Sequence, residues 1–224
     1  MTDPIDLDGP RFGPAPGQAT ALVVLLHGLG ADGNDLISLA PYFARAVPGA
    51  AFVAPHAPEP CDMAPFGRQW FSLGNRDPAE ILNGVRAAAA RLDGFLDMEL
   101  ARFGLDDARL ALVGFSQGTM MALHVAPRRA RPCAAVIGYS GMLIGPDLLA
   151  GEMRGRPPVL LVHGEADEIV GFPAMAAAAA ALAAVGLEVE AHARPGLGHG
   201  IDEEGIHLGM AMLSARLGAP MEHS

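Results

Sequence analysis

Short apolar runs alternate with helical patterns along nearly the whole chain, and this alternation restricts the fold more than any other feature. The runs that we predict to be strands cover residues 21–26, 50–55, 109–115, 133–139, 158–163 and 188–193. They are rich in Val, Ile and Leu and mostly do not alternate with polar residues, which is typical of strands covered on both faces. We therefore expect an α/β fold with a mostly parallel central sheet flanked by helices on both faces, and ligands at the carboxyl ends of the strands.

The clearest helix prediction begins after Asp77. Asp77 is a residue type that caps the start of a helix. Pro78 is favoured in the first turn, and Glu80 is favoured at the third position. Gly104 is suited to end the same helix, and the apolar residues between recur at spacings of three, four and seven: Ile81, Val85, Ala88, Leu92, Phe95, Leu96 and Phe103. A second helix is expected over residues 173–186.

The composition limits both the size of the fold and the kind of partner. The 224 residues are enough for one sizeable domain but few for two cores, so we expect a single domain over residues 1–224. Hydrophobic residues make up 51% and charged residues 18%, which excludes a disordered chain. The net charge of −10 disfavours binding to nucleic acid and to anionic membranes, so a neutral small-molecule substrate fits better.

The sequence has no obvious targeting or membrane segment. Residues 1–13 contain no basic stretch followed by an apolar core, and no apolar run reaches the roughly 18 residues that a membrane helix needs. We expect a soluble, cytoplasmic protein without stable membrane insertion. Cys61 and Cys133 are too few for a disulfide framework and lack metal-ligand spacing, so we expect two reduced structural thiols and no metal.

Ser116 lies between Gly114 and Gly118, after a predicted strand and before a stretch that can form a helix. A Gly-x-Ser-x-Gly pattern in this context predicts a nucleophile elbow. The elbow strains the serine backbone, and glycines two residues away leave room that a Cβ would fill. Ser140 also follows a strand, but Met142 stands where the second glycine should be, so we do not expect Ser140 to be the nucleophile.

A serine hydroxyl needs a base to accept its proton, and the base needs a carboxylate to orient it. On the fold that carries such an elbow the acid and then the histidine follow the serine. This order excludes as the base four earlier histidines: His27, His56, His124 and His163. Among the later ones, His192 falls in a predicted strand, His207 in a predicted helix and His223 in the tail. His199 remains, in a glycine-rich loop from which its imidazole can reach toward Ser116.

Three carboxylates just beyond a predicted strand are candidates for the acid: Glu165, Asp167 and Glu168. A short side chain there can point inward while its longer neighbours point to water, but the preference for Asp167 rests mainly on the family resemblance described below. The residues alone leave Glu168 open. Asp147 and Asp202 fit a helix cap better than a catalytic role.

The turn LLHGLGADGNDL after the first long strand is expected to hold the negative oxygen of a reacting carbonyl. Gly28 and Gly30 let the backbone approach closely, so that the Leu29 amide can donate, and Gln117 supplies the second amide. His27 is expected to brace this loop by hydrogen bonds. The loop lacks the third glycine and the following acid of a dinucleotide site, so we expect no cofactor.

Five segments resemble, in this order, the phospholipase/carboxylesterase family of α/β-hydrolases: LLHGLGADGNDL, RQWFSL, GFSQGTMMAL, HGEADEIV and GLGHGI. That family includes acyl-protein thioesterases and small bacterial carboxylesterases, and the resemblance covers residues 20–215. It implies an α/β-hydrolase fold with the nucleophile at Ser116, the acid at Asp167, the base at His199 and the oxyanion amides at Leu29 and Gln117.

The chain departs from the family pattern at two positions. Ser72 stands where the family usually has Asp, and Gly171 stands where a proline commonly follows the acid segment. The first departure removes a charge near the expected pocket, which weakens any substrate assignment copied from relatives.

The connection from residue 57 to residue 78 carries apolar side chains among prolines: Met63, Phe66, Trp70, Phe71 and Leu73. Because long irregular segments in compact domains are often functional, we expect an apolar wall there that holds an acyl or aryl group. Arg68 and Arg76 are expected at its rim. The alternative is ordinary packing under a loop, and Trp70 could serve both purposes.

Residues 141–157 are too few for a helical lid domain, so we expect an open site without a large lid. Together these features predict a serine carboxylesterase for small, water-soluble esters with short to medium acyl or aryl groups, acting through an acyl-enzyme. A thioesterase for acyl-proteins or a hydrolase of acyl phospholipids is the alternative, because the same oxyanion chemistry serves both leaving groups. A peptidase or a non-catalytic binding module fits the sequence less well. We expect a monomer or a homodimer.

Overall fold

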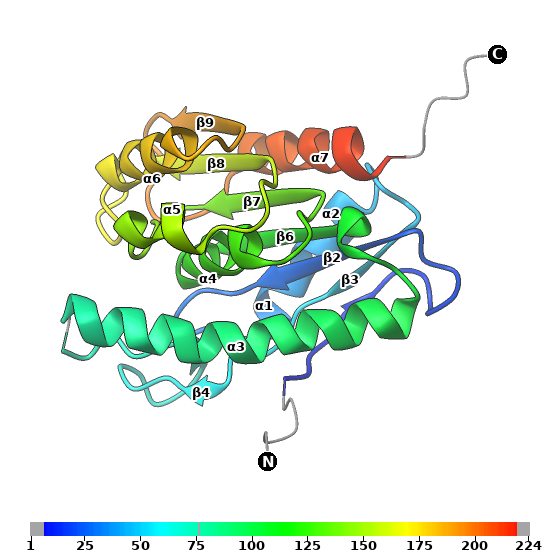
Figure 1. Cartoon of the computed structure of the whole chain (residues 1–224), viewed down its shortest axis with the longest axis horizontal. Helices are drawn as coiled ribbons and strands as arrows, with labels where there is room; N and C mark the ends of the chain where they lie inside the picture. The colour runs from blue at the N-terminus through cyan, green and yellow to red at the C-terminus, as the bar shows by residue number, and fades with distance from the viewer. Residues whose placement is uncertain (1–6, 76, 219–224) are drawn as a thin grey trace.

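A seven-stranded sheet forms the centre of the computed structural model, which describes residues 7–75 and 77–218 (Figure 1). In spatial order its strands are β1 (Arg11–Phe12), β3 (Ala50–Val53), β2 (Ala21–Leu26), β6 (Leu110–Phe115), β7 (Ala135–Tyr139), β8 (Val159–Gly164) and β9 (Val189–Arg194). Neighbouring strands pair in parallel, except that β1 runs antiparallel to β3. The mostly parallel sheet predicted from the sequence is confirmed.

Helices cover both faces of this sheet (Figure 1). They are α1 (Gly33–Leu36), α2 (Ala40–Phe43), α3 (Pro78–Phe103), α4 (Gln117–Val125), α5 (Leu149–Glu152), α6 (Pro173–Ala184) and α7 (Glu203–Leu217). Alternate residues of β2 belong to different cores. Leu22, Val24 and Leu26 pack in the core that includes α3, α4 and α6, whereas Val23 and Leu25 pack in the core that includes α2 and α7. This two-sided burial explains why the central strands read as unbroken apolar runs.

Helix α3 follows the sequence prediction closely. The Asp77 side chain accepts hydrogen bonds from the N–H groups of Ala79 and Glu80, and Pro78 occupies the first helical position. Gly104 ends the helix with a φ of 68°, a left-handed conformation that glycine adopts at little cost. The predicted stripe is buried except for Ile81, which is half-buried.

Several elements were not predicted or differ from the prediction. The two-residue strands β1, β4 (Glu59–Pro60) and β5 (Arg68–Gln69) are too short to show any periodicity. Strand β9 lies at the edge of the sheet and is half-exposed, in contrast to the expected burial on both faces. In the described part of the chain, no helix is long and apolar enough to cross a membrane.

Candidate active site

Ser116 occupies the sharp turn between β6 and α4. Its backbone has a φ of 54° and a ψ of −116°, which is unfavourable for a residue with a side chain. The Ser116 N–H donates to the Tyr139 carbonyl of the neighbouring strand over 2.9 Å, so the turn is held against β7. The conformation is that of the predicted nucleophile elbow, and it raises the hydroxyl at the carboxyl edge of the sheet.

Both glycines of the pattern are required by close contacts. A Cβ on Gly114 would lie 2.4 Å from the Thr119 nitrogen, and a Cβ on Gly118 would lie 1.8 Å from the Leu26 carbonyl oxygen. These contacts are backbone atoms that cannot move aside easily. Any larger residue at either position would therefore push the elbow away from the sheet.

Asp167 and His199 meet at the same edge of the sheet. One carboxylate oxygen of Asp167 accepts a hydrogen bond from the His199 Nδ1 over 2.8 Å. The other accepts from the N–H groups of Ile169 and Val170, each over 2.9 Å. Because an ionised carboxylate only accepts, His199 must carry its proton on Nδ1 and keeps Nε2 free for a second partner.

The environment of Asp167 favours its ionised form. Burial alone would raise the pKa of this carboxyl, but the hydrogen bonds from His199 and from two backbone N–H groups outweigh it and lower the pKa. Asp167 is therefore a fixed negative group in the neutral range, suited to orient an imidazole and to stabilise its protonated form.

The His199 ring lies against Phe115, the residue before Ser116, with 4.9 Å between ring centroids. Glu165 and Glu168, the other acids considered from the sequence, are exposed. Asp202 caps α7 by accepting from the Gly205 N–H, as expected.

Asp147 differs from the prediction. It lies inside the short 3₁₀ helix Pro146–Leu148, whose N-cap position is Gly145, so it caps no helix. A run of three residues is too short for its cap to be read from the sequence pattern.

His163 contacts the carboxylate of Asp167. The sequence excluded His163 as the catalytic base and predicted no other role for it. Its Nε2 donates to the Val170 carbonyl over 2.8 Å and lies 3.2 Å from the Asp167 oxygen that His199 also contacts. His163 is buried and limits the positions that Asp167 can adopt. The sequence signal that could have indicated this contact is the position of His163, four residues before Asp167.

The backbone N–H groups of Leu29 and Gln117 are left available to donate a hydrogen bond to a ligand. Among the described residues, the N–H groups of Gly30 and Ala31 bond to other carbonyls, whereas the Leu29 N–H has no partner. Gln117 is the first residue of α4, so its N–H has no intrahelical acceptor. A Cβ on Gly28 would lie 3.3 Å from the Ser116 Cβ, so this loop approaches the nucleophile directly.

His27 holds this loop by hydrogen bonds. Its Nε2 accepts from the Ala57 N–H over 2.9 Å, so the proton must be on Nδ1, which donates to the Gly28 carbonyl over 2.7 Å. Burial lowers the pKa of His27, which keeps the ring neutral. Since the peptide is planar and trans, a Gly28 carbonyl directed at His27 turns the Leu29 N–H to the opposite side.

The Gln117 side chain joins the elbow to a distant segment, a role that the sequence did not reveal. Its Oε1 accepts from the Trp70 N–H and its Nε2 donates to the Phe71 carbonyl, each over 2.8 Å. The Trp70 indole donates in turn to the His27 carbonyl over 3.0 Å. The two loops that carry the candidate oxyanion amides are thus connected through one tryptophan.

The residues proposed for an apolar wall separate into two groups. Trp70 and Phe71 are each 2% exposed and belong to the main core, which fits the packing alternative. Leu73 is partly buried against that core. Met63 and Phe66 project into solvent, with exposed fractions of 59% and 74%. Their contact with a substrate stays a prediction.

The charges near this segment also differ from expectation. The Arg68 guanidinium donates to the carbonyls of Ala57 and Pro58 and braces the loop instead of standing free at a rim. Arg76 lies outside the described residues. Ser72 donates to the Asp62 carboxylate, so a negative charge is present beside position 72 although Ser72 itself is neutral.

In the residues that the structure describes, no group of three or more His, Cys, Asp or Glu side chains could hold a metal ion. The arrangement can support nucleophilic attack by a serine, proton transfer by an imidazole and stabilisation of an oxyanion by two backbone amides.

Comparison with known proteins agrees with this chemistry. Residues 13–214 match the family described as Phospholipase/Carboxylesterase. The chain is 32% identical over 200 residues to a probable carboxylesterase of Oryza sativa subsp. japonica, covering 81% of this chain and 83% of that one. It is 28% identical over 207 residues to acyl-protein thioesterase 1 of Gibberella zeae, covering 85% and 88%.

The crystal structure of esterase PE8 superposes with a TM-score of 0.89 at 40% sequence identity, covering 94% of this chain and 99% of that chain. The family match extends over nearly all of the sheet and over every loop that carries a candidate site residue. The chain therefore belongs to the phospholipase/carboxylesterase family of α/β-hydrolases and is a serine hydrolase that acts on carboxylic esters.

Proposed function

We propose that this hydrolase is a carboxylesterase for small, water-soluble esters with short to medium acyl or aryl groups, acting through an acyl-enzyme. The observation that carries the proposal is the 2.8 Å hydrogen bond from His199 to Asp167, made at the same sheet edge as the strained Ser116 elbow. A residue in such a conformation costs about 1–3 kcal/mol and is typical of functional sites.

In the proposed reaction, the Ser116 oxygen attacks the ester carbonyl carbon while His199 Nε2 takes the hydroxyl proton. The negative oxygen that forms is held by the N–H groups of Leu29 and Gln117. When the tetrahedral intermediate collapses, His199 returns the proton to the departing alcohol, and Asp167 stabilises the imidazolium. A water molecule then repeats the cycle and releases the carboxylic acid.

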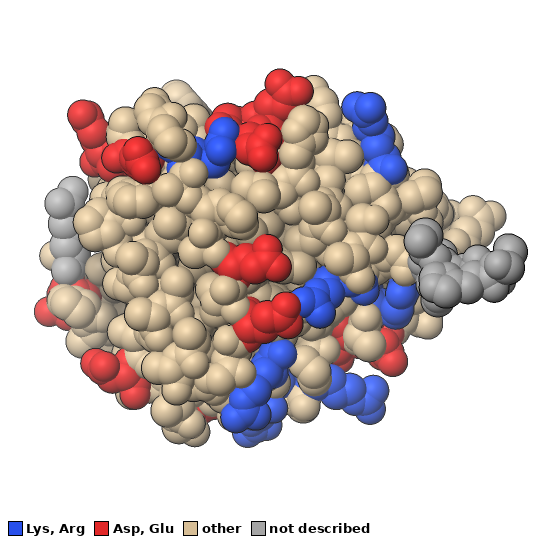
Figure 2. Space-filling view, turned by 90° about the horizontal axis from the view of Figure 1, so that it is seen from above, with Lys and Arg blue, Asp and Glu red and all other residues tan. Residues whose placement is uncertain are grey.

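The preference for small esters is supported by the lack of a large cover over the site. Between β7 and β8 the chain forms only the 3₁₀ helix Pro146–Leu148 and the four-residue helix α5. Figure 2 shows acidic and basic side chains interspersed over the face seen from above, with uncharged surface between them. The net charge of −10 favours a neutral substrate over an anionic one.

A hollow of about 190 Å³ lies beside Phe115, whose ring also contacts the His199 ring. Its walls are Asp35, Leu36, Ser38, Leu39, Phe115 and Ile201. Because His199 delivers the proton to the leaving group, we assign this hollow to the alcohol part of the ester. Its size suits a small alcohol and would not enclose a long chain.

The thioester alternative is favoured by the relatives named acyl-protein thioesterase. An ester and a thioester with the same acyl group separate the two functions. A carboxylesterase should give the higher kcat/KM on the oxygen ester, and the opposite ranking would replace this proposal with the thioesterase.

We also propose a cytoplasmic location and a monomer or homodimer. Cys61 and Cys133 are free thiols in the structure, which agrees with a reducing compartment. Burial raises the pKa of the Cys133 thiol to about 12, so this group is unreactive. Thiol titration of protein purified without reductant and light scattering test these two proposals.

The central test is Ser116→Ala with graded p-nitrophenyl esters. Turnover should fall on the order of 10⁶-fold, while the melting temperature is retained because the elbow backbone stays in place. Stoichiometric labelling of Ser116 by a fluorophosphonate should disappear in the same variant. Near-normal ester turnover by Ser116→Ala would contradict the proposal, and no labelling of the wild type would favour a binding module.

A further inference from the structure

Ser140, at the end of the neighbouring strand, has the same unusual backbone conformation as Ser116. Among the described residues, only Ser116 and Ser140 combine a side chain with a positive φ, of 54° and 49°. They directly follow the neighbouring strands β6 and β7. The Ser116 N–H donates to the Tyr139 carbonyl over 2.9 Å, and the Ser140 N–H donates to the Val162 carbonyl over 3.0 Å. Each turn is therefore held against the next strand in the same way.

A glycine would adopt the backbone of Ser140 without strain. What serine adds is a hydroxyl, and this hydroxyl has a defined partner. It donates to the Gly200 carbonyl over 3.3 Å, across 60 positions of sequence. Ser140 is 1% exposed, so bulk water does not compete strongly for this hydrogen bond.

Gly200 directly follows His199, in a loop whose two ends are joined by the Arg194 Nε hydrogen bond to the Asp202 carboxylate over 2.9 Å. Upstream of the imidazole, the Ala166 N–H donates to the Leu197 carbonyl over 2.9 Å. Downstream, in the described part of the chain, the Ser140 hydroxyl is the one hydrogen-bond partner of the Gly200 carbonyl. Asp167 fixes the ring, and Ser140 fixes the backbone on the following side.

We propose that Ser140 is a positioning residue of the active site. Its hydroxyl tethers Gly200 and thereby holds the His199 imidazole in line with both Asp167 and Ser116. The inference rests on the proposed function, because it assigns to His199 the role of the base. Ser140 itself does not contact the reacting atoms, so its loss should slow the chemical step without weakening substrate binding.

Two substitutions separate the hydroxyl from the backbone strain. Ser140→Ala removes the hydroxyl and keeps the strain, whereas Ser140→Gly removes both. Because a misplacement of about 1 Å can cost up to 10²-fold in rate, kcat should fall by about tenfold in each variant. KM should stay within about twofold of wild type, since no binding contact is removed. Ser214→Ala is the matched control, because Ser214 is exposed on α7.

A second measurement reports the imidazole directly. The proton between His199 Nδ1 and Asp167 should give a downfield resonance in the NMR spectrum of the wild type and of Ser214→Ala. In Ser140→Gly this resonance should broaden or vanish through faster exchange with water. The melting temperature of Ser140→Gly should equal or exceed that of Ser140→Ala, since the strain is relieved.

Two results would overturn the tether: wild-type kcat in Ser140→Gly, or an unchanged His199 resonance in that variant. If Ser140→Ala lost rate and Ser140→Gly did not, the backbone conformation at position 140 would matter and the bond to Gly200 would not. If the wild type hydrolyses no ester, or if Ser116→Ala keeps activity, the proposed function fails instead. The His199 resonance still decides the tether in that case.

Discussion

Two charged networks in this molecule are each centred on a buried side chain, Arg129 in one and Asp167 in the other, and they differ in whether every polar group has a partner. Arg129 follows α4, and its guanidinium contacts three carboxylates with its three nitrogens: Asp93, Asp97 and Asp107. Its side chain is only 6% exposed. This network joins α3 to the turn before β6 and to the end of α4, and every guanidinium nitrogen has a partner.

The network around Asp167 is built from similar contacts but ends differently. Both carboxylate oxygens are used, by His199 on one side and by two backbone N–H groups on the other. Within the described ranges, the His199 Nε2 nevertheless has no hydrogen-bond partner. A closed network stabilises the arrangement of helices, whereas an open one holds a reactive group in place.

The two networks are expected to affect different properties, the Arg129 network the stability of the fold and the Asp167 network the turnover of substrate. Substitutions in the Arg129 network should lower the free energy of unfolding and leave the turnover of folded molecules intact. Substitutions in the Asp167 network should lower turnover and leave stability nearly intact. The predictions below test whether the two networks are independent in this way.

The largest effect is expected for Asp167→Asn. The amide fills the same volume, but it no longer favours the His199 tautomer with its proton on Nδ1, so kcat should fall by about 10⁴-fold. The melting temperature should change little. Steady-state kinetics and thermal unfolding of the same preparation measure both quantities. A fall in melting temperature as large as that of Arg129→Met would show that the site also supports the fold.

Arg129→Met should have the largest effect on stability. It leaves three carboxylates without their cation, of which only Asp107 is largely buried, so we expect a loss of about 3 kcal/mol in the free energy of unfolding. Urea unfolding measures it. Arg131→Met, at an exposed position with no ion pair among the described residues, is the control and should be neutral. A large loss of kcat in folded Arg129→Met would contradict the expectation that the Arg129 network affects stability alone.

The sequence predicted the parts of the fold that carry strong local signals. The six long strands have apolar runs, and α3 has a cap, a first-turn proline and a terminating glycine. The two-residue strands have no such pattern, because a period cannot be read from two positions. The half-exposure of β9 does have a local signal, because residues 188–193 alternate polar and apolar side chains, as is typical of a strand with one face in water.

The candidate site was predictable to the extent that its residues have sequence patterns. Ser116 has the two glycines, and His199 follows from the order of the chain. The tether from Ser140 to Gly200 and the bonds from Gln117 to Trp70 could not be read, because they join residues 60 and 47 positions apart. The Arg129 network is hidden for the same reason.

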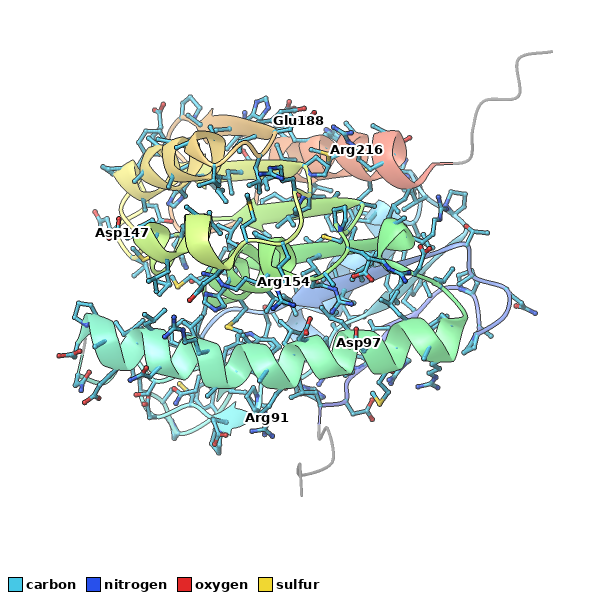
Figure 3. The ribbon with its side chains drawn as sticks, in the orientation of Figure 1. Arg91, Asp97, Asp147, Arg154, Glu188 and Arg216 are labelled. Atoms are coloured by element: carbon cyan, nitrogen blue, oxygen red, sulfur yellow. The ribbon has the colours of Figure 1, made fainter. Side chains whose placement is uncertain are left out.

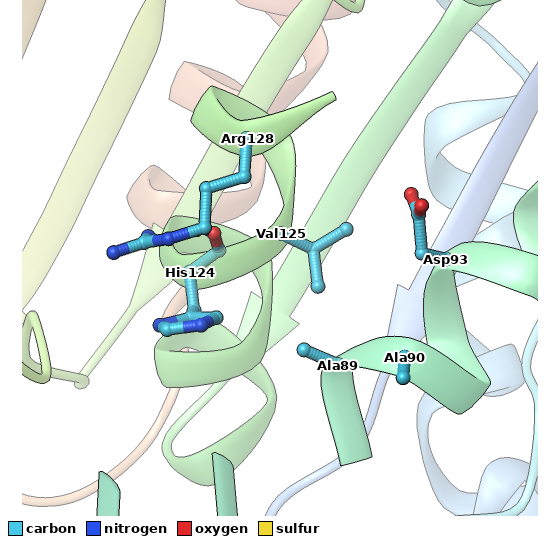
Figure 4. A pocket seen from close by; sticks show the side chains of 6 residues that line it. All are labelled: Ala89, Ala90, Asp93, His124, Val125 and Arg128. Atoms are coloured by element: carbon cyan, nitrogen blue, oxygen red, sulfur yellow. Dashed lines mark hydrogen bonds between the residues drawn. The ribbon is translucent and has the colours of Figure 1, made fainter. Parts of the chain in front are cut away.

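A third buried ionisable group, His124, lies on α4. His124 and Arg128 face Ala89, Ala90 and Asp93 of α3 around a pocket of about 170 Å³ (Figure 4). Burial and the nearby Arg128 charge lower the pKa of His124 to about 4. Among the residues that the structure describes, the His124 Nδ1 atom has no hydrogen-bond partner, so packing holds the neutral ring.

The lowered pKa of His124 predicts a loss of stability in acid. The unfolded chain takes up this proton near pH 6.5, but the folded chain does so only near pH 4. The contribution of the neutral ring is therefore complete above pH 6.5 and declines as the pH falls toward 4, by about 1 kcal/mol after allowance for solvent screening. His124→Leu should show a shallower fall in melting temperature across this window. Equal slopes for the variant and the wild type would contradict the assignment.

The smallest effect is expected within the Arg129 network itself. Asp97 lies on α3 with a side chain that is 67% exposed, and its carboxylate is 2.7 Å from Arg129 Nη2 (Figure 3). Asp97→Asn should cost only about 0.5 kcal/mol, because water can replace most of an exposed ion pair. Asp107→Asn should cost more, since the Asp107 side chain is 13% exposed and its charge is harder to replace.

Urea unfolding of Asp97→Asn, of Asp107→Asn and of each combined with Arg129→Met gives the coupling energy between each aspartate and Arg129. Equal couplings for both aspartates would mean that the network acts as a single unit, and stability would then depend on the cluster as a whole rather than on its one well-buried pair.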